Sequence, residues 1–154
     1  FKRQALTILK EEGIDEPVPG KWYSQQAWLN GFKKIGDKFG AATLKQIGEN
    51  VAKSANWPKE IKTIEDALKS IDVAYHMNHR NGKIGNYTFT KVDDETGRMV
   101  CSNPYPDQFD LGLIRAVGEK FKPSNAPFTV EIDAGQPTRT KGAESTAFII
   151  KGFK

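Results

Sequence analysis

The chain has 154 residues, of which 38% are hydrophobic, 27% charged and 10% aromatic. This length fits one domain, and the composition is too apolar and too evenly charged for a disordered chain. No apolar run approaches the roughly 18 to 20 residues that cross a bilayer, so we expect no membrane span. The net charge of +4 is spread along the chain without a basic block, which disfavours nucleic-acid binding.

The cysteine content restricts the redox setting and the metal chemistry. Cys101 is the one cysteine in the sequence, so the chain forms no internal disulfide and no cage made of thiolates alone. We therefore expect a reducing, cytoplasmic setting.

Residues 1–80 are predicted to be mainly helical. A short amphipathic helix over residues 2–12 precedes a loop with two prolines at 15–20, and Ser24 is a candidate N-cap for the next helix. Apolar residues then recur at spacings of three and four, which is typical of a buried helical stripe. The stripes are Trp28, Leu29, Phe32, Ile35 and Phe39; Leu44, Ile47 and Val51; and Ile61, Ile64, Leu68, Ile71 and Tyr75.

Residues 81–154 are predicted to form a hairpin, a helix and a second hairpin. Side chains alternate over residues 87–92, 98–102 and 128–132, and residues 146–153 are the second arm of the second hairpin. Asp107 or Asp110 is the expected cap of the intervening helix. The run at 148–150 is apolar on both faces, which indicates a central strand, and residues 134–145 form a long connection. The sequence therefore predicts one α+β domain, residues 1–154, with helices packed on a small antiparallel sheet.

Common catalytic motifs are absent from the sequence. There is no phosphate-binding loop, dinucleotide-binding turn or serine nucleophile elbow, which disfavours the common nucleotide enzymes and α/β hydrolases. We assign no catalytic residues and expect a binding protein in preference to an enzyme.

The two histidines, His76 and His79, are candidate ligand contacts near a predicted helix end. Their i, i+3 spacing would place them on one side, where they could meet a metal or an anion with Cys101 or Asp107. The competing interpretation is that both are helix-terminal residues favoured by the helix dipole. Cys101 itself fits a small buried hydrophobe better than a nucleophile.

The aromatic residues suggest a cavity for a flat or greasy ligand. The competing interpretation is that these rings only fill the core. The predicted cavity-lining rings are Trp28, Phe32, Tyr75, Tyr87, Phe89, Tyr105 and Phe109, with polar contacts from His76, His79, Arg98 and Cys101. Arg80, Arg98 and Arg139 are candidate cationic groups at its mouth, although each alone is typical of a solvated surface.

The C-terminal half resembles the 4-vinyl-reductase-like domain and the related haem-NO-binding domain superfamily. The resemblance covers about residues 60–154 and rests on the order hairpin, helix, hairpin with four short motifs. These are G-x-Y-x-F at 85–89, R-M-V-C-S-N-P-Y-P at 98–106, F-D-x-G at 109–112 and K-G-A-E-S-T-A-F-I-I at 141–150. It implies a sensory or binding module that holds a hydrophobic ligand, acyl chain or tetrapyrrole and that is often a homodimer.

One departure from this pattern bears on metal binding. Relatives often carry cysteines where this chain has Asp107, Thr138 and Ser145, and hydroxyls bind zinc poorly, so a structural zinc site is disfavoured. Haem or another tetrapyrrole stays open through His76 or His79. The leading hypothesis is a sensory or regulatory domain that binds a hydrophobic or aromatic small molecule. The alternatives are a tetrapyrrole- or metal-dependent enzyme that uses the histidines, and a protein-interaction module with an aromatic patch around Trp22 and Trp57.

Overall fold

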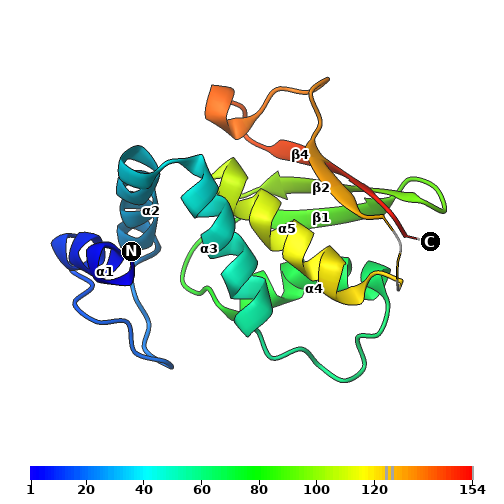
Figure 1. The fold of residues 1–154 in the computed structure, drawn as a ribbon. Coiled ribbons are helices and arrows are strands. Elements are labelled where there is room, and N and C mark those ends of the chain that lie inside the picture. Colours follow the sequence, from blue (N-terminus) through cyan, green and yellow to red (C-terminus); the bar gives the residue numbers. More distant parts are fainter. Residues whose placement is uncertain (124, 126, 154) are drawn as a thin grey trace. The chain divides into compact units, whose positions relative to one another are not determined.

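The computed structural model describes residues 1–123, 125 and 127–153. Over these residues the chain forms five α-helices, a short 3-10 helix and four strands (Figure 1). They make two compact units, Phe1–Leu44 and Lys45–Lys154, and each is considered by itself. The single domain expected over 1–154 stays a prediction, and three of its residues, Ser124, Ala126 and Lys154, lie outside the described part.

The first unit contains helix α1 (Lys2–Glu11), helix α2 (Gln25–Phe39) and the first turn of helix α3 (Ala41–Ser54). The predicted cap of α2 is confirmed, because Ser24 Oγ accepts a hydrogen bond of 3.3 Å from the Ala27 amide. α1 packs closely on α2 at Gly31, where an added Cβ would lie 2.9 Å from Leu9 Cδ2. The apolar stripe predicted for α2 is only partly buried, with Phe32 and Ile35 its most enclosed large residues.

The second unit is built on an antiparallel sheet with the order β1-β2-β4-β3. The strands are β1 (Asn86–Lys91), β2 (Thr96–Ser102), β3 (Thr129–Ile132) and β4 (Thr146–Lys151). The two predicted hairpins, β1-β2 and β3-β4, are confirmed. β4 is an internal strand, as its apolar run at 148–150 predicts, because β2 and β3 both pair with it.

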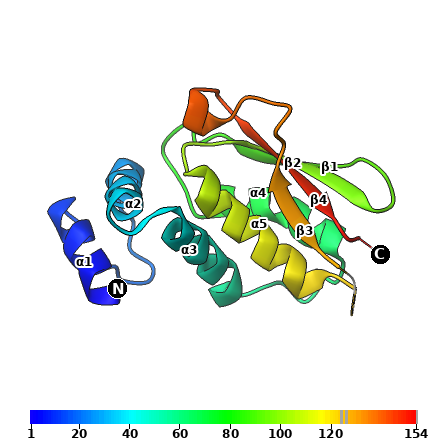
Figure 2. The same cartoon turned by 45° about the horizontal axis from the view of Figure 1, so that its top comes forward.

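Helices α4 (Ile64–Met77) and α5 (Asp107–Phe121) pack against each other and against the sheet (Figures 1 and 2). β2 alternates in burial, so that Met99 and Cys101 share the buried face as predicted. The core between the helices and the sheet contains Met99, Ile114, Val117, Phe148 and Ile150, all with no exposed surface. These layers confirm the predicted α+β class.

Helix α3 approaches α5 so closely that two glycines are required. A Cβ at Gly48 would collide with the Phe109 carbonyl, and a Cβ at Gly112 would collide with the carbonyl of Lys45. The backbones of the two helices therefore touch directly, which no larger residue permits.

Two expected helix features are corrected by the structure. α4 ends at Met77, so His79 lies outside the helix and does not share a helical face with His76. The N-cap of α5 is Pro106, and neither Asp107 nor Asp110 caps the helix, because both carboxylates are buried in contacts with a distant loop.

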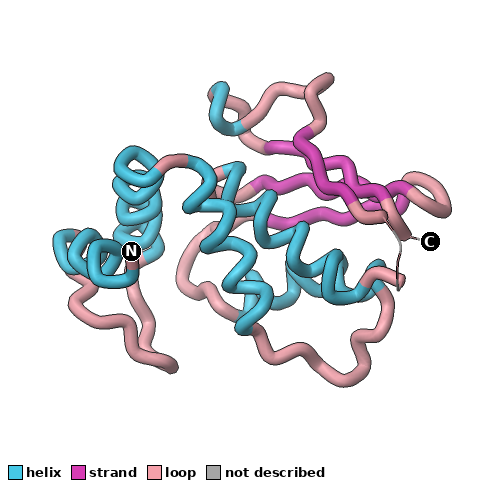
Figure 3. The backbone as a smooth tube through the Cα atoms, in the orientation of Figure 1, coloured by secondary structure: helices cyan, strands magenta, loops and turns pink. Residues whose placement is uncertain are grey.

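That loop is the segment 133–145 between β3 and β4, which Figure 3 shows as a long irregular connection carrying one short helix. The short helix, Arg139–Lys141, is placed beside the beginning of α5 by hydrogen bonds to Asp107. Within the described part of the chain, no helix is both long and apolar enough to cross a membrane.

Candidate functional site

Five of the predicted site residues meet in the second unit and are called the aromatic cluster here: Tyr75, His79, Tyr87, Tyr105 and Phe109. They come from α4 and the turn after it, from β1, from the connection before α5, and from α5 itself. Tyr75 is central, with ring centroids 4.3 Å from His79, 5.1 Å from Tyr87 and 6.0 Å from Tyr105. Tyr105 stacks on Phe109 at 5.3 Å. These five rings thus lie together in the fold, and the ligand cavity predicted among them stays a prediction.

His79 uses both ring nitrogens inside the aromatic cluster. Nδ1 lies 2.7 Å from the backbone oxygen of Tyr75, and Nε2 lies 2.8 Å from the Tyr105 hydroxyl. A carbonyl oxygen only accepts hydrogen bonds, so Nδ1 carries the proton. In the neutral imidazole, Nε2 then accepts the hydrogen bond that the Tyr105 hydroxyl donates. His79 and Tyr105 are partly exposed, so this polar pair is the solvent-facing side of an otherwise buried group of rings.

His76 belongs to a different surface. Its side chain is 47% exposed, and Nε2 lies 3.4 Å from Asp72 Oδ1 and 3.3 Å from Asn86 Oδ1. The Asp72 carboxylate also accepts a hydrogen bond of 2.8 Å from the Tyr87 amide. His76 therefore helps to attach α4 to the start of β1, and its contacts differ from those of His79.

A buried set of polar side chains adjoins the aromatic cluster and is called the polar network: Asn103, Asp107, Asp110, Arg139 and Thr146. Arg139 is its centre. Arg139 Nε donates to Asp107 Oδ1 at 2.9 Å, Nη2 donates to Asp110 Oδ2 at 2.8 Å, and Nη1 donates to Asn103 Oδ1 at 2.7 Å. The Thr146 hydroxyl donates to Asp107 at 2.7 Å. Among the described residues, no buried side-chain nitrogen or oxygen lacks a hydrogen-bond partner.

Burial and hydrogen bonding act in opposite directions on the two carboxylates. Burial raises the pKa of Asp107, but hydrogen bonds from Thr140 and Thr146, with the charge of Arg139, outweigh it and hold that pKa below its usual value. Asp110 is more deeply buried, and desolvation keeps the pKa of this carboxyl above its usual value despite the opposing charge of Arg139.

Two further groups touch the polar network from the sheet. The Tyr87 hydroxyl donates to Asp110 Oδ1 at 2.5 Å, and burial together with the Asp110 charge raises the pKa of Tyr87 well above its usual value. Cys101 is fully buried beside Asp110, and desolvation likewise raises the pKa of its thiol. A thiol with a raised pKa is a poor nucleophile at neutral pH, so Cys101 behaves as a small buried side chain.

The remaining predicted site residues lie elsewhere. In the first unit, Trp28 packs on Phe32 with ring centroids 6.1 Å apart. In the second, Phe89 packs on Phe153 at 6.0 Å. Arg98 occupies the face of β2 opposite Cys101, where Nη2 lies 4.0 Å from Asp133 Oδ2, so the structure does not bring Arg98 to the aromatic cluster.

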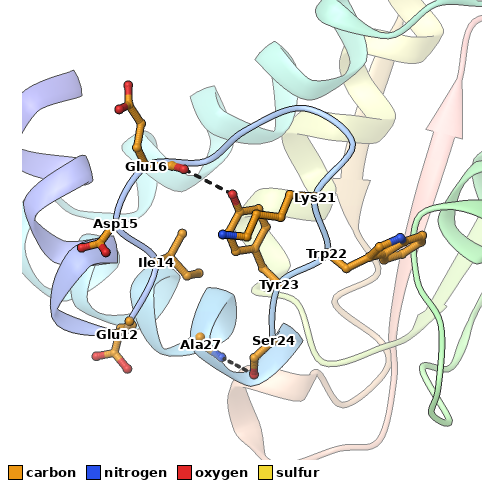
Figure 4. Close-up of a pocket in the computed structure, with 10 residues that line it drawn as sticks. Glu12, Ile14, Asp15, Glu16, Lys21, Trp22, Tyr23, Ser24 and Ala27 are labelled. Carbon is orange, nitrogen blue, oxygen red and sulfur yellow. Dashed lines mark hydrogen bonds between the residues drawn. The ribbon is translucent and has the colours of Figure 1, made fainter.

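A separate hollow of about 280 Å³ lies in the first unit (Figure 4). It is partly open and is lined by residues 12–16, 21–24 and Ala27, none of which was a predicted ligand contact, although Trp22 belongs to the predicted interaction patch. The Tyr23 hydroxyl crosses it, accepting from the Val18 amide at 2.9 Å and donating to the Glu16 carbonyl at 3.2 Å. Trp22 points away from these residues and is 47% exposed. The hollow reflects how the loop folds on itself around Tyr23.

The described contacts restrict how this unit could hold a metal ion or a haem iron. In residues 1–123, 125 and 127–153, no group of three histidine, cysteine or acidic side chains is placed to hold a metal ion. For a haem iron, the Nδ1 contact of His79 with a carbonyl is the usual orientation of an imidazole ligand. However, Nε2 is already occupied by Tyr105, and His76 lies on the surface. As arranged, the histidines do not fit an axial iron ligand.

The sequence did not predict that the side chains of the polar network meet. Arg139 was a candidate for the mouth of a cavity, and Asp107 and Asp110 were candidate helix caps. Arg139 lies 32 residues from Asp107 and 29 from Asp110 along the chain. The only local signal was the unusual length of the connection at 134–145, which does not specify a partner.

Comparison with known proteins extends the description of the fold. No protein-family description matches the sequence. No curated protein matches it either. Solved structures do resemble it: an H-NOX protein from S. oneidensis in the Fe(II)NO ligation state has a TM-score of 0.70 at 12% identity, covering 99% of this chain and 90% of that one. A point mutant of T. Tengcongensis H-NOX has a TM-score of 0.68 at 15% identity, covering 97% and 87%.

A third similar structure is an oxygen-binding H-NOX domain related to soluble guanylate cyclases, with a TM-score of 0.65 at 16% identity, covering 97% of this chain and 85% of that chain. At these identities the likeness concerns the fold. The chain has the H-NOX fold, and the resemblance to the haem-NO-binding superfamily is confirmed at that level.

Proposed function

We propose that this chain is a sensory or regulatory domain that binds a hydrophobic or aromatic small molecule at the aromatic cluster. The observation that carries the proposal is that five rings from separate segments of the chain pack together, and that two of them, His79 and Tyr105, form a partly exposed hydrogen-bonded pair. His79 and Tyr105 offer an apolar ligand their partly exposed rings and one hydrogen-bonding pair to orient it, and the buried rings of Tyr75, Tyr87 and Phe109 pack behind them.

The fold supports a sensory role. The similar structures include a domain described as oxygen-binding and related to soluble guanylate cyclases, and one in an Fe(II)NO state. Those descriptions belong to the neighbours, whose sequences are 16% identical or less to this chain. They favour a module that binds a small ligand over one that performs a reaction.

The energetics of such binding would come mainly from apolar surface. A flat ligand that covers the exposed edges of His79 and Tyr105 gains about 25 cal/mol for each Å² of apolar area removed from water. The hydroxyl and imidazole then decide orientation, because either group left without a partner in the complex costs about 1–3 kcal/mol.

A tetrapyrrole fits this proposal as a flat apolar ligand, and haem stays a prediction. Because His79 Nε2 is held by Tyr105, we assign no step to iron.

An enzyme that uses the histidines and a protein-interaction module also stay as predictions. Trp57 gives little support to the interaction module, because its ring packs on Phe121 with centroids 5.1 Å apart and its Nε1 donates to the Ala52 carbonyl at 3.1 Å. A homodimer likewise stays a prediction.

Titration with hemin and with iron-free protoporphyrin IX tests the proposal. Both are expected to bind, with similar dissociation constants, and His79→Gln is expected to weaken both by about tenfold or more. Trp28→Phe, which alters a predicted ring in the first unit, is the matched control. Native mass spectrometry of the purified chain identifies any ligand that co-purifies with it. Failure of both probes to bind, with no co-purified molecule, contradicts the proposal.

A further inference from the structure

The segment 133–145 is attached to the rest of its unit in an unusual way. Much of its backbone hydrogen bonding is local, such as Lys141 and Ala143 to the Thr138 carbonyl, and most of its residues are exposed. Segments with few buried apolar contacts open at low free-energy cost. What holds this segment is the side chain of Arg139, inserted among buried acceptors.

The attachment has three points on the body of the unit. Arg139 reaches Asp107 and Asp110 on α5 and both oxygens of Asn103 before it. The Thr140 hydroxyl adds a hydrogen bond of 2.7 Å to Asp107. One guanidinium thus faces two carboxylates in a buried site, so losing it leaves uncompensated charge.

The same attachment continues into the aromatic cluster. Asn103 Oδ1 accepts from both Arg139 Nη1 at 2.7 Å and the Tyr105 amide at 2.9 Å, while the Tyr105 hydroxyl holds His79. On the other side, the Tyr87 ring packs on Tyr75 while its hydroxyl binds Asp110. A displacement of Tyr105 therefore moves Asn103, whose Oδ1 accepts the hydrogen bond from Arg139.

We propose that residues 133–145 are a strap closed by Arg139, and that the Asn103–Tyr105 turn couples its closure to the aromatic cluster. A ligand that takes the place of the Tyr105 hydroxyl at His79 shifts this turn, withdraws Asn103 from Arg139 and loosens the strap. The ligand-dependent half of this inference rests on the proposed function, whereas the mechanical coupling does not.

Cys101 reports the opening of the strap. It is the one cysteine of the sequence, is fully buried and adjoins Asp110 and Arg139. Labelling with a thiol reagent in native buffer should be slow in the wild type. In Arg139→Gln it should become faster by about tenfold or more. Ile150→Val, which trims the core at the far end of β4, is the control for general loss of stability.

The proposal is overturned if Cys101 is labelled no faster in Arg139→Gln than in the wild type. It is also overturned if the labelling rate of Arg139→Gln depends on urea as its global unfolding does, which is the behaviour expected of Ile150→Val. Should Arg139→Gln fail to fold, Thr140→Ala removes one hydrogen bond of the strap and gives the same comparison. In that variant the expected acceleration is several-fold.

Amide exchange tests the coupling without any ligand. The Arg139 amide donates to Thr146 Oγ1 at 2.8 Å, so its protection reports the closed strap. Tyr105→Phe should speed exchange there while leaving the Met99 amide in β2 unchanged. No change at Arg139 overturns the coupling. Adding protoporphyrin IX to the wild type should have the same effect as Tyr105→Phe. If the probe does not bind, the proposed function fails while the variant results still decide the coupling.

Discussion

The histidine pair shows how much a single residue position decides. The spacing of His76 and His79 suggested two imidazoles on one helical face, but α4 ends between them at Met77. His79 consequently turns into the rings of Tyr75 and Tyr105, whereas His76 stays on the surface beside Asp72. The sequence identified both residues as candidates, and the termination of one helix, which propensity locates only to within a residue or two, separated their roles.

Arg139→Met is expected to be severely destabilising. It leaves Asp107 and Asp110 buried without their cation, and breaking such a pair typically costs about 3–5 kcal/mol. Urea denaturation measures the loss. Arg98→Met is the matched control, because Arg98 is 37% exposed and its contact with Asp133 is 4.0 Å long. Equal effects of the two substitutions would contradict the central place given to Arg139.

At the scale of elements, periodicity predicted most of the fold. The β1-β2 and β3-β4 hairpins, the capped helix α2 and the internal strand β4 all follow from patterns of neighbouring residues. Long-range partners were beyond these patterns. Asp107 and Asp110 look like helix caps until the loop carrying Arg139 is folded against them, and no local signal reveals contacts across 32 and 29 residues.

The β1-β2 turn gives a pH prediction. Hydrogen bonds from the backbone amides of Glu95 and Thr96 lower the pKa of Asp93 from its ordinary 3.8. Because the folded-state pKa is depressed, this contribution to stability is present above the unfolded value and is lost as the pH falls through the folded value. Asp93→Asn keeps the acceptor oxygen but does not titrate, so it should flatten the loss of stability below pH 3.8.

Chemical denaturation at a series of acid pH values measures that slope. Asp94→Asn is the control, since it removes a neighbouring charge of the same turn and leaves in place the two amides that bond to Asp93. A slope unchanged by Asp93→Asn would argue against the turn as the source of the shift.

The contact between α3 and α5 gives a packing prediction. Gly112→Ala should destabilise the protein by about 1–3 kcal/mol. The added methyl group collides with the backbone carbonyl of Lys45, which can move aside only if the two helices shift apart. Gly82→Ala is the matched control, with nothing within 4 Å of its Cβ. Thermal unfolding distinguishes them. A Gly112→Ala protein as stable as the wild type would mean that the helices separate freely.

For the whole molecule, the resemblance read from four short motifs led to the right fold although no sequence match supports it. The order of a hairpin, a helix and a second hairpin carried that inference, since topology persists where identity falls to 12%. The rings of the aromatic cluster were also named from the sequence. The sequence did not show that the predicted rings divide between two units, because Trp28 and Phe32 resemble the other rings in spacing but pack in the first unit.

An amide chemical-shift map of the full chain titrated with protoporphyrin IX tests ligand binding at the aromatic cluster directly. Binding at the aromatic cluster predicts saturable shifts at His79 and Tyr105, accompanied by shifts at Arg139 and Thr140 in the strap. Shifts confined to residues 12–27 around the hollow of the first unit, or no shifts at all, would contradict it.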